Sequence, residues 1–418
     1  MDIQQEQRRD NPPTNPHIAL ERRYCAHNYA PLPVVLSRGE GIWLWDEQGR
    51  RYMDMMSAYS AVSFGHAHPQ LVAALASQAQ RLAVTSRAFY SDKLGLFLQR
   101  LCETVGMERA LPMNSGAEAV ETAIKAARKW AYTSKRVPQG RARIVVCKGN
   151  FAGRTTTIVG FSSEAQYRAG FGPFDGGFDS VPFGDADALE AAITPDTAAF
   201  LVEPIQGEGG IVVPPEGYLR RCREICTRRQ VLLICDEVQT GLGRTGRLLA
   251  CDHDGIRPDG LVLGKALGGG LLPVSAFLAR ADVMAVFTPG DHGSTFGGNP
   301  LAAAVATKAL ELLADGVLID NAERMGRRLR EGLRAIGHPA IREVRGRGLL
   351  IGMDLDPALI GGRAFCERLM ARGILSRETH DTVVRFAPPL LIDAEQVDFA
   401  LAAIRAVFSE IGEALHEH

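Results

Sequence analysis

The sequence has few lysines, few aromatic residues and almost no net charge. Only seven of its 47 basic side chains are lysines, aromatic residues occupy 7% of the 418 positions, and the formal net charge is -1. A chain without net charge has no overall field that attracts nucleic acid or an anionic membrane. We therefore expect neither as a partner, and each lysine can be considered individually for a chemical role.

Paired cysteines and long apolar runs are also absent. The eight cysteines lie scattered in hydrophobic or helical stretches with no CxxC pair, which predicts reduced core residues and no metal site. No uncharged apolar run reaches about 18 residues, and residues 1–17 lack the features of a signal or transit peptide. The expected location is the cytoplasm.

The chain is long enough for about two or three folded units. Residues 1–20 are polar, and their prolines predict an arm without regular helix that orders against another surface, such as a dimer interface. Residues 34–55 hold short strands broken by glycine-containing turns and predict a small antiparallel meander. An amphipathic helix is expected to begin at Pro69.

Strands and helices alternate between about residues 110 and 290. Apolar strands are predicted at 143–147, 198–204, 231–238 and 260–264, with helices between them such as 116–133 and 217–230. This alternation predicts an α/β fold with a largely parallel sheet that helices cover on both faces.

The last part of the chain has a different order. After Pro300 comes a long helical tract to about residue 336, followed by short strands and two helices, which predicts a smaller α+β domain. We expect an N-terminal arm and antiparallel segment at 1–60, a large α/β domain at 61–300 and the small domain at 301–418. A cleft between the last two is the expected ligand site.

Three polar positions follow predicted strands, where open α/β sheets bind ligands. Asp236 ends an apolar strand and could meet a cationic group, although it could also be a turn or helix-capping residue. Lys265 leads from an apolar strand into a glycine-rich loop, where loss of water would make its amine nucleophilic, unless the side chain reaches solvent.

The third position is Ser115-Gly116-Ala117, at the predicted start of a long helix. Backbone N–H groups and a hydroxyl at a helix N-terminus suit a phosphate, and the alternative is an ordinary N-cap at Asn114 or Ser115. An aspartate, a lysine and a phosphate cup in one α/β domain together indicate pyridoxal 5'-phosphate. The lysine would bind it covalently and the aspartate would keep its ring nitrogen protonated.

Other motifs compete with this interpretation. Residues 241–246 match the dinucleotide pattern GxGxxG, but no helix is predicted at the third glycine, which disfavours an NAD-dependent oxidoreductase. The motifs His66-Ala-His68 and Asp252-His-Asp254 lack the helical spacing and the third partner of a metal site, so turn residues are expected there.

The sequence resembles the class III, fold-type I aminotransferases from about Tyr24 to its last helix. The resemblance rests on GIWLWDEQGRRYMD, GHAHP, NSGAEAVETAIKAARKW, EPIQGEGG, DEVQTGLGRTG, LGKALGGGLLPVSA and GSTFGGNPLA. It is narrowed to the ornithine δ-aminotransferase branch by CAHNYAPLPVVLSRGEG, SAYSAVSFGHAHP, TSRAFYSDKLG, GNFAGRT, FGPF, DHGSTFGGNPL and VVRFAPPLLI. It implies a large domain with a mostly parallel seven-stranded sheet, a small α+β domain and an N-terminal arm.

The resemblance implies roles around the cofactor. Lys265 would be the Schiff-base lysine and move the proton, Asp236 would pair with the ring nitrogen, Gln239 would bond the ring oxygen and Phe151 would stack on the ring. Ser115, Gly116 and Ala117 would hold the phosphate, together with Ser294 and Thr295 from a second subunit. A homodimer or a higher homo-oligomer follows from that last assignment.

Substrate roles follow from the same resemblance. Arg154 would bind the carboxylate farther from the reacting carbon, and Arg385 the α-carboxylate of glutamate or 2-oxoglutarate, with Glu208 pairing with Arg385 when ornithine is bound. Tyr29 would help to hold the α-amino and carboxylate end of ornithine, and Tyr59 would shape the distal pocket and favour ornithine over N-acetylornithine or 4-aminobutyrate, unless both tyrosines only pack at an interface.

The implied reaction transfers the δ-amine of L-ornithine to 2-oxoglutarate. It gives glutamate 5-semialdehyde, which cyclises to pyrroline-5-carboxylate, and L-glutamate. The alternatives are an ω-aminotransferase for N-acetylornithine, 4-aminobutyrate or lysine, and a family member without catalytic activity.

Overall fold

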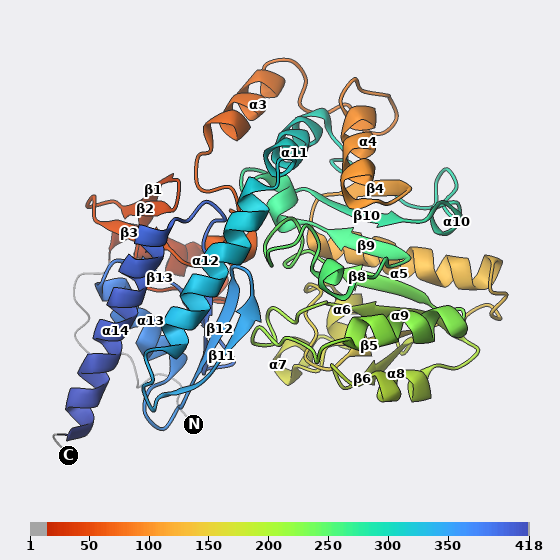
Figure 1. Cartoon of the computed structure of the whole chain (residues 1–418). Coiled ribbons are helices and arrows are strands. Elements are labelled where there is room, and N and C mark those ends of the chain that lie inside the picture. The colour runs from red at the N-terminus through yellow and green to blue at the C-terminus, as the bar shows by residue number, and fades with distance from the viewer. Residues whose placement is uncertain (1–14, 417–418) are drawn as a thin grey trace, which may run out of the picture.

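The large sheet forms one side of the computed structural model, which describes residues 15–416, and the C-terminal part lies beside it (Figure 1). Its strands are arranged in the order β4 (Arg109–Met113), β10 (Ser275–Ala279), β9 (Gly260–Leu263), β8 (Leu232–Asp236), β7 (Thr197–Val202), β5 (Arg143–Cys147) and β6 (Phe178–Val181). β10 pairs antiparallel with both neighbours, and the other pairs are parallel. The mostly parallel seven-stranded sheet is confirmed.

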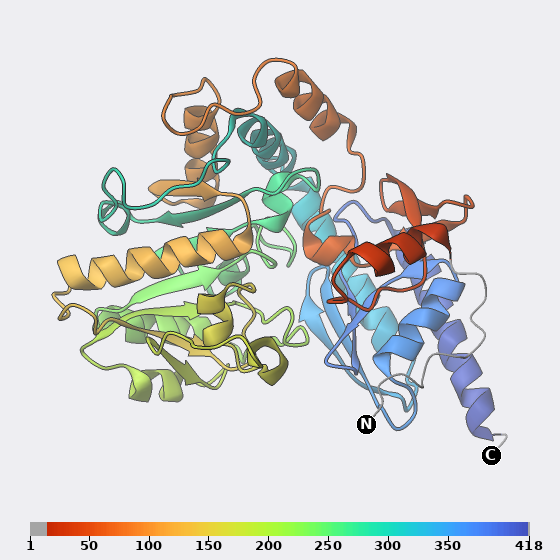
Figure 2. The same ribbon diagram turned by 180° about the vertical axis from the view of Figure 1, so that it is seen from behind.

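Helices cover this sheet on both faces, as the alternating pattern predicts. α5 (Gly116–Thr133) packs on one face against β9 and β10, and it is seen in front of the sheet in Figure 2. α8 (Ala186–Ala192) and α9 (Tyr218–Arg228) lie on the other face. The inner strands β7, β8, β9 and β10 are buried along their whole length and are therefore mostly continuous apolar runs rather than alternating ones.

The N-terminal part differs from expectation at its start. A helix, α1 (Pro16–Tyr24), forms where an irregular arm was predicted, because a proline is tolerated at the first helical position and Asn15 caps the helix. Residues 1–14 lie outside the described part. The antiparallel meander is confirmed as β1 (Leu36–Glu40), β2 (Trp43–Asp46) and β3 (Arg51–Asp54), and β3 also pairs in parallel with β13 (Ile374–Leu375).

The C-terminal part contains a four-stranded antiparallel sheet. Its order is β11 (Ile341–Arg347), β12 (Leu350–Leu355), β15 (Val383–Phe386) and β14 (Arg377–Thr379), flanked by α12 (Val317–Arg334), α13 (Gly362–Ala371) and α14 (Ala394–His416). The predicted long helical tract is broken: α11 (Pro300–Leu313) ends before Gly316, which has a φ of 76°.

The expected division into 1–60, 61–300 and 301–418 stays a prediction. α11 packs against α3 (Pro69–Ala79) and α4 (Leu94–Val105), which belong to the predicted large domain, and α12 packs against α14. This packing favours a boundary near Gly316. The remaining helices are short: α2 (Ser57–Ser60), α6 (Thr156–Gly160), α7 (Ala165–Arg168), α10 (Ala281–Met284) and the 3-10 helices Ala250–Asp254 and Lys265–Gly268.

Two further expectations concern the cysteines and the membrane. Six cysteines are buried as predicted, but Cys25 is exposed, because it follows the surface helix α1, and Cys102 is half-buried. Within residues 15–416 no helix is both long enough and apolar enough to cross a bilayer. The cytoplasmic location stays a prediction.

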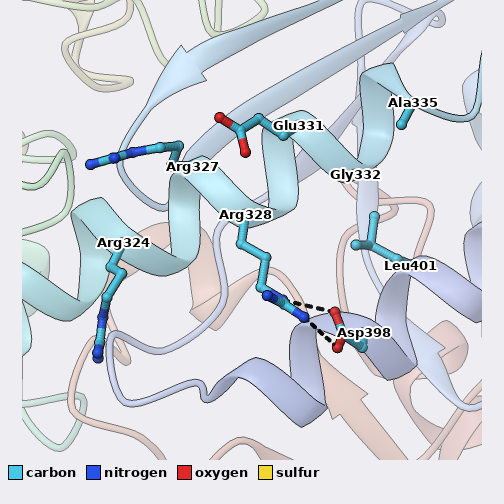
Figure 3. A pocket seen from close by; sticks show the side chains of 8 residues that line it. All are labelled: Arg324, Arg327, Arg328, Glu331, Gly332, Ala335, Asp398 and Leu401. Atoms are coloured by element: carbon cyan, nitrogen blue, oxygen red, sulfur yellow. Dashed lines mark hydrogen bonds and ion pairs between the residues drawn. The ribbon is translucent and has the colours of Figure 1, made fainter.

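A surface cavity of about 440 Å³ lies between α12 and α14 (Figure 3). Arg328 forms two hydrogen bonds to Asp398, of 2.8 and 2.6 Å, and Arg327 pairs with Glu323 at 3.5 Å. The first pair bridges α12 and α14, and the second lies within α12. None of the predicted site residues lines this cavity.

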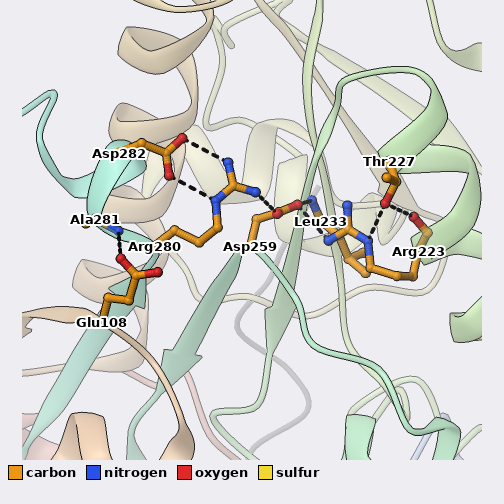
Figure 4. Close-up of polar contacts among 8 residues, drawn as sticks. All are labelled: Glu108, Arg223, Thr227, Leu233, Asp259, Arg280, Ala281 and Asp282. Carbon is orange, nitrogen blue, oxygen red and sulfur yellow. Dashed lines mark hydrogen bonds and ion pairs between the residues drawn. The ribbon is translucent and has the colours of Figure 1, made fainter.

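A buried carboxylate joins a helix and two strands at the end of the large sheet that lies opposite the carboxyl ends of its parallel strands (Figure 4). Asp259, which is 6% exposed, accepts from Arg223 Nη1 at 2.7 Å and from the backbone N–H of Leu233 at 2.8 Å, and it also pairs with Arg280. Arg280 makes a second, exposed pair with Asp282 at 2.9 Å. Asp259 therefore ties α9, β8 and the end of β10 together.

Asp259→Ala is expected to lower the free energy of unfolding by about 3 kcal/mol, because it removes the buried carboxylate that accepts from two arginines and leaves the buried N–H of Leu233 without its acceptor. The thermal midpoint should fall by roughly 5–10 °C. Asp282→Ala, which breaks the exposed pair with the same Arg280, is the control and should cost less than about 1 kcal/mol. Equal midpoints for the two variants would contradict this role of Asp259.

Candidate functional site

A pocket of about 170 Å³ lies at the carboxyl ends of β7, β8 and β9. It is lined by Gly116, Ala117, Phe151, Ala152, Gly153, Glu203, Glu208, Asp236, Val238, Gln239, Thr240 and Lys265. The structure thus brings together the lysine, the aspartate and the helix N-terminus that the sequence predicts. Parallel strands end at the same edge of the sheet, and this explains why residues far apart in sequence meet there.

Lys265 begins a 3-10 helix directly after β9 and Gly264, with a φ of 42°. Its side chain faces the pocket and is otherwise surrounded by protein. Burial lowers the pKa of the Lys265 ammonium, while the charges of Glu208, Asp236 and Glu203 act in the opposite direction. This environment raises the fraction of neutral amine, as a nucleophile requires.

Two carboxyl groups lie near this lysine. Asp236, 6% exposed, ends β8, and burial raises its pKa to about 6. Glu203 follows β7, and burial together with Asp236 raises its pKa to about 8. Glu203 accepts hydrogen bonds from the backbone N–H of Phe151 at 2.9 Å and of Gly207 at 3.2 Å, so it joins two loops of the pocket wall.

Glu203 was missed in the sequence interpretation. It follows an apolar strand in the same way as Asp236. The strand-end rule could therefore have found it.

The predicted phosphate cup is the N-terminus of α5. Ser115 is the N-cap: its hydroxyl accepts from the N–H of Glu118 at 3.2 Å, and the Glu118 carboxylate accepts from the N–H of Ser115 at 2.8 Å. The capping alternative is therefore confirmed for the Ser115 side chain, and Gly116 and Ala117 face the pocket. A Cβ on Gly116 would come within 2.9 Å of Val238, so glycine lets the helix end approach the pocket floor.

Ser294 and Thr295 lie beside this cup on the surface. Within the same chain, Asn114 Nδ2 donates to Ser294 Oγ at 2.9 Å, and Thr295 is exposed. Their predicted action in a second subunit's site stays a prediction.

An ion pair from the C-terminal sheet closes one side of the site. Arg385 on β15 donates from Nη1 to Glu208 Oε1 at 2.6 Å, and the two side chains are only 7% and 21% exposed. The guanidinium carbon of Arg385 lies 4.9 Å from the centre of the Tyr59 ring. Gln239 Nε2 donates to the backbone oxygen of Tyr59 at 3.4 Å and to Glu208 Oε1 at 3.5 Å, so it links the two segments.

Tyr59 is held by an unusual backbone. The residues from Ser57 to Ser60 all have positive φ, at 50°, 46°, 60° and 72°, although none is glycine. This left-handed conformation costs roughly 1–2 kcal/mol per residue. Asp54 stabilises the turn by accepting from the N–H of Ser57 at 2.8 Å, and its other oxygen lies 2.8 Å from His66 Nε2.

The other two predicted substrate residues are more exposed. Arg154 lies on the loop between β5 and α6, directly after the pocket residues Ala152 and Gly153. Tyr29 is 71% exposed on the segment before β1 and does not line the described pocket. The structure thus places Arg154 beside the pocket and leaves Tyr29 outside it.

The GxGxxG match has a structural role instead. Residues 241–246 form turns, followed by the 3-10 helix Ala250–Asp254 rather than a long helix. Arg244 is fully buried and donates to Leu349 O at 3.1 Å, to Pro388 O at 2.5 Å and to Ser63 Oγ at 3.0 Å. The motif therefore links the large sheet to the C-terminal part.

Comparison with known proteins adds the family. The family model described as aminotransferase class III matches residues 24–408. This chain belongs to that family. It is therefore a pyridoxal phosphate-dependent aminotransferase, as its sequence predicted.

Individual relatives of this aminotransferase agree with that assignment. The ornithine aminotransferase of Brevibacillus brevis is 52% identical over 94% of this chain and 98% of its own. A Toxoplasma gondii ornithine aminotransferase structure, described with partial occupancy of PLP, has a TM-score of 0.94 at 48% identity and covers 95% of this chain and 94% of its own. The acetylornithine aminotransferase of Elizabethkingia anophelis has a TM-score of 0.86 at 45% identity, covering 94% and 98%.

The pocket residues fit this cofactor. Phe151 and Val238 supply apolar surface for the ring, the N-terminus of α5 offers backbone N–H groups for the phosphate, and Lys265 and Asp236 line the same pocket. A Cβ on Gly207 would overlap Gln239 Oε1 at 1.4 Å. The backbone at Gly207 therefore lies directly against Gln239, the residue expected to bond the ring oxygen of the cofactor.

The protonated Glu203 carboxyl should contribute stability to the cofactor-free protein that is lost as pH rises, because the folded state binds this proton more tightly than the unfolded chain does. The pKa of Glu203 is raised from 4.5 to about 8, so its stabilising protonation is complete below about pH 4.5 and is lost by about pH 8. Glu203→Gln should remove this component, and the wild-type thermal midpoint should fall by several degrees relative to the variant between about pH 5 and pH 8. If the difference between the two thermal midpoints stays constant over that pH range, the titration of Glu203 does not contribute to stability as predicted.

Proposed function

We propose that this aminotransferase transfers the δ-amine of L-ornithine to 2-oxoglutarate. The observation that carries the proposal is the buried Arg385–Glu208 pair at 2.6 Å, because a site for ornithine and for a dicarboxylate needs one arginine that can be neutralised. Ornithine entering by its δ-amine brings no carboxylate to Arg385, and Glu208 then supplies the counter-charge. A dicarboxylate brings its own anion and replaces Glu208.

The residues of the pocket divide the chemistry between them. Pyridoxal phosphate, when bound, supplies an aldehyde for the amine and an electron-withdrawing ring. Lys265 Nζ would hold the cofactor covalently and, once released from it, would take up and return the proton at the reacting carbon of the substrate. Asp236 is proposed to hold the ring nitrogen protonated, because a buried carboxylate is stabilised by a cation in contact with it. Phe151 would cover the ring, and Gln239 would bond its oxygen.

Substrate positioning is proposed to depend on two arginines. Arg154 would bind the carboxylate farther from the reacting carbon in both substrates, and Arg385 would bind the α-carboxylate of glutamate or 2-oxoglutarate. Tyr59, beside Arg385, favours ornithine over N-acetylornithine, which stays the alternative amino donor. Tyr29, exposed here, would join the ornithine site only after moving toward the pocket.

We also propose a homodimer. Exposed apolar side chains gather on α3, on α4 and on the segments beside them: Val72, Leu82, Val84, Phe89, Tyr90, Leu96 and Phe296. Exposed apolar groups of this kind mark protein interfaces. Phe296 directly follows Ser294 and Thr295, so a second copy bound to this face would bring those two residues toward its own phosphate cup.

The test of this function is the visible spectrum of the purified holoenzyme. L-ornithine should abolish the visible band of the bound cofactor, and 2-oxoglutarate should restore it, while Lys265→Ala should show no turnover. A wild-type band that responds to N-acetylornithine or 4-aminobutyrate but not to ornithine would contradict the substrate assignment. A protein that binds no pyridoxal phosphate would contradict the mechanism as a whole.

Glu208→Ala should favour glutamate over ornithine, because Arg385 is then always free for a carboxylate and lacks a counter-charge when ornithine binds. The ratio of the two half-reaction rate constants should shift by at least about tenfold, which corresponds to about 1.4 kcal/mol. Single-turnover absorbance measures both rates. Glu40→Ala, which removes an exposed pair with Arg38 at 2.5 Å, is the control. An unchanged ratio in Glu208→Ala would exclude Glu208 from the switch.

A further inference from the structure

Arg154 is stacked on an aromatic ring that the sequence interpretation did not include. Its guanidinium carbon lies 3.5 Å from the centre of the Tyr167 ring and 5.5 Å from that of Phe151. Tyr167 lies on α7 and is half-buried, and its ring meets Phe151 edge-on, with centres 6.2 Å apart and an interplanar angle of 82°. One row of contacts thus leads from the cofactor-facing Phe151 through Tyr167 to Arg154.

The two arginines proposed for substrate binding have different partners. Arg385 is paired with the Glu208 carboxylate at 2.6 Å and also lies near the Tyr59 ring. In residues 15–416 no carboxylate pairs with Arg154, and its partners there are neutral rings. Arg385 must therefore break an ion pair before it binds substrate, and Arg154 need not.

The geometry of stacking explains why a ring suits Arg154. A ring attracts the flat face of a guanidinium, and the N–H groups at its edge stay free for a carboxylate, which binds in the same plane through two hydrogen bonds. A carboxylate partner would occupy that edge and would compete with the substrate. A long exposed side chain without any partner would lose conformational entropy on binding.

We propose that Tyr167 is a positioning residue that holds the Arg154 guanidinium in one plane, with its edge open to the far carboxylate of either substrate. This inference rests on the proposed function, because it takes Arg154 as the site of that carboxylate. The two arginines then differ in their partners. The neutral ring leaves Arg154 free to bind a substrate carboxylate in both half-reactions. Glu208 occupies Arg385 in the half-reaction with ornithine and leaves it free only in the half-reaction with the dicarboxylate.

The surroundings of Tyr167 agree with a place inside the substrate site. Burial raises the pKa of the Tyr167 hydroxyl, and the charges of Arg154, Glu208 and Arg385 all act on it. Arg154 is thus in contact with the Tyr167 ring, and Glu208 and Arg385 act on the hydroxyl through their charges.

The test compares Tyr167→Leu and Tyr167→Phe as holoenzymes. Tyr167→Leu should raise the KM of ornithine and of 2-oxoglutarate about tenfold while kcat changes less than about twofold, because the interaction is the same in ground and transition states. Tyr167→Phe keeps the ring face and should stay within about twofold of the wild type. Phe171→Leu is the control for loss of a ring near α7, since Phe171 is 63% exposed.

A second readout separates positioning from general damage. The half-reaction with L-alanine uses no far carboxylate, so its rate should be the same in Tyr167→Leu and in the wild type. An equal loss with alanine, or an unchanged KM for both main substrates, would overturn the proposal. A wild-type enzyme that does not use ornithine would contradict the proposed function. The role of Tyr167 could still be tested in that case, because the measurements with 2-oxoglutarate and glutamate do not need ornithine.

Discussion

The ion pair between Arg385 and Glu208 is the interaction on which the account of the site depends. It joins the C-terminal sheet to a loop of the large domain beside Lys265, and both side chains are largely buried. A buried arginine is costly without a counter-charge, so any ligand that approaches must either leave the pair intact or replace its anion. One active site can in this way accept substrates with different charges at the same position.

The C-terminal domain also holds the loop that carries Glu208. Thr379 Oγ1 donates to the main-chain oxygen of Glu208 at 2.8 Å, and Arg345 Nε donates to Gly210 O at 2.9 Å. These two contacts hold the backbone of the loop against the sheet of β11, β12, β15 and β14, and the ion pair with Arg385 holds the Glu208 side chain.

The sequence predicts those parts of the site that depend on local pattern. Asp236 and Lys265 follow long apolar runs, and a parallel sheet brings such strand ends together. The start of α1 at Pro16 and the break before Gly316 were missed, since proline is tolerated at a first helical turn and one glycine in a helical tract is ambiguous. The stacking of Arg154 on Tyr167 and the left-handed turn at Tyr59 depend on tertiary contacts, and no spacing in the sequence indicates them.

The exchange of Glu208 for a substrate carboxylate can be seen in a crystal structure of the holoenzyme with a bound dicarboxylate, such as glutamate. We expect the Arg385 guanidinium to bind the α-carboxylate of the ligand and Glu208 to have turned away, so that their 2.6 Å contact is lost. An intact Arg385–Glu208 pair with glutamate bound in the site would contradict this exchange.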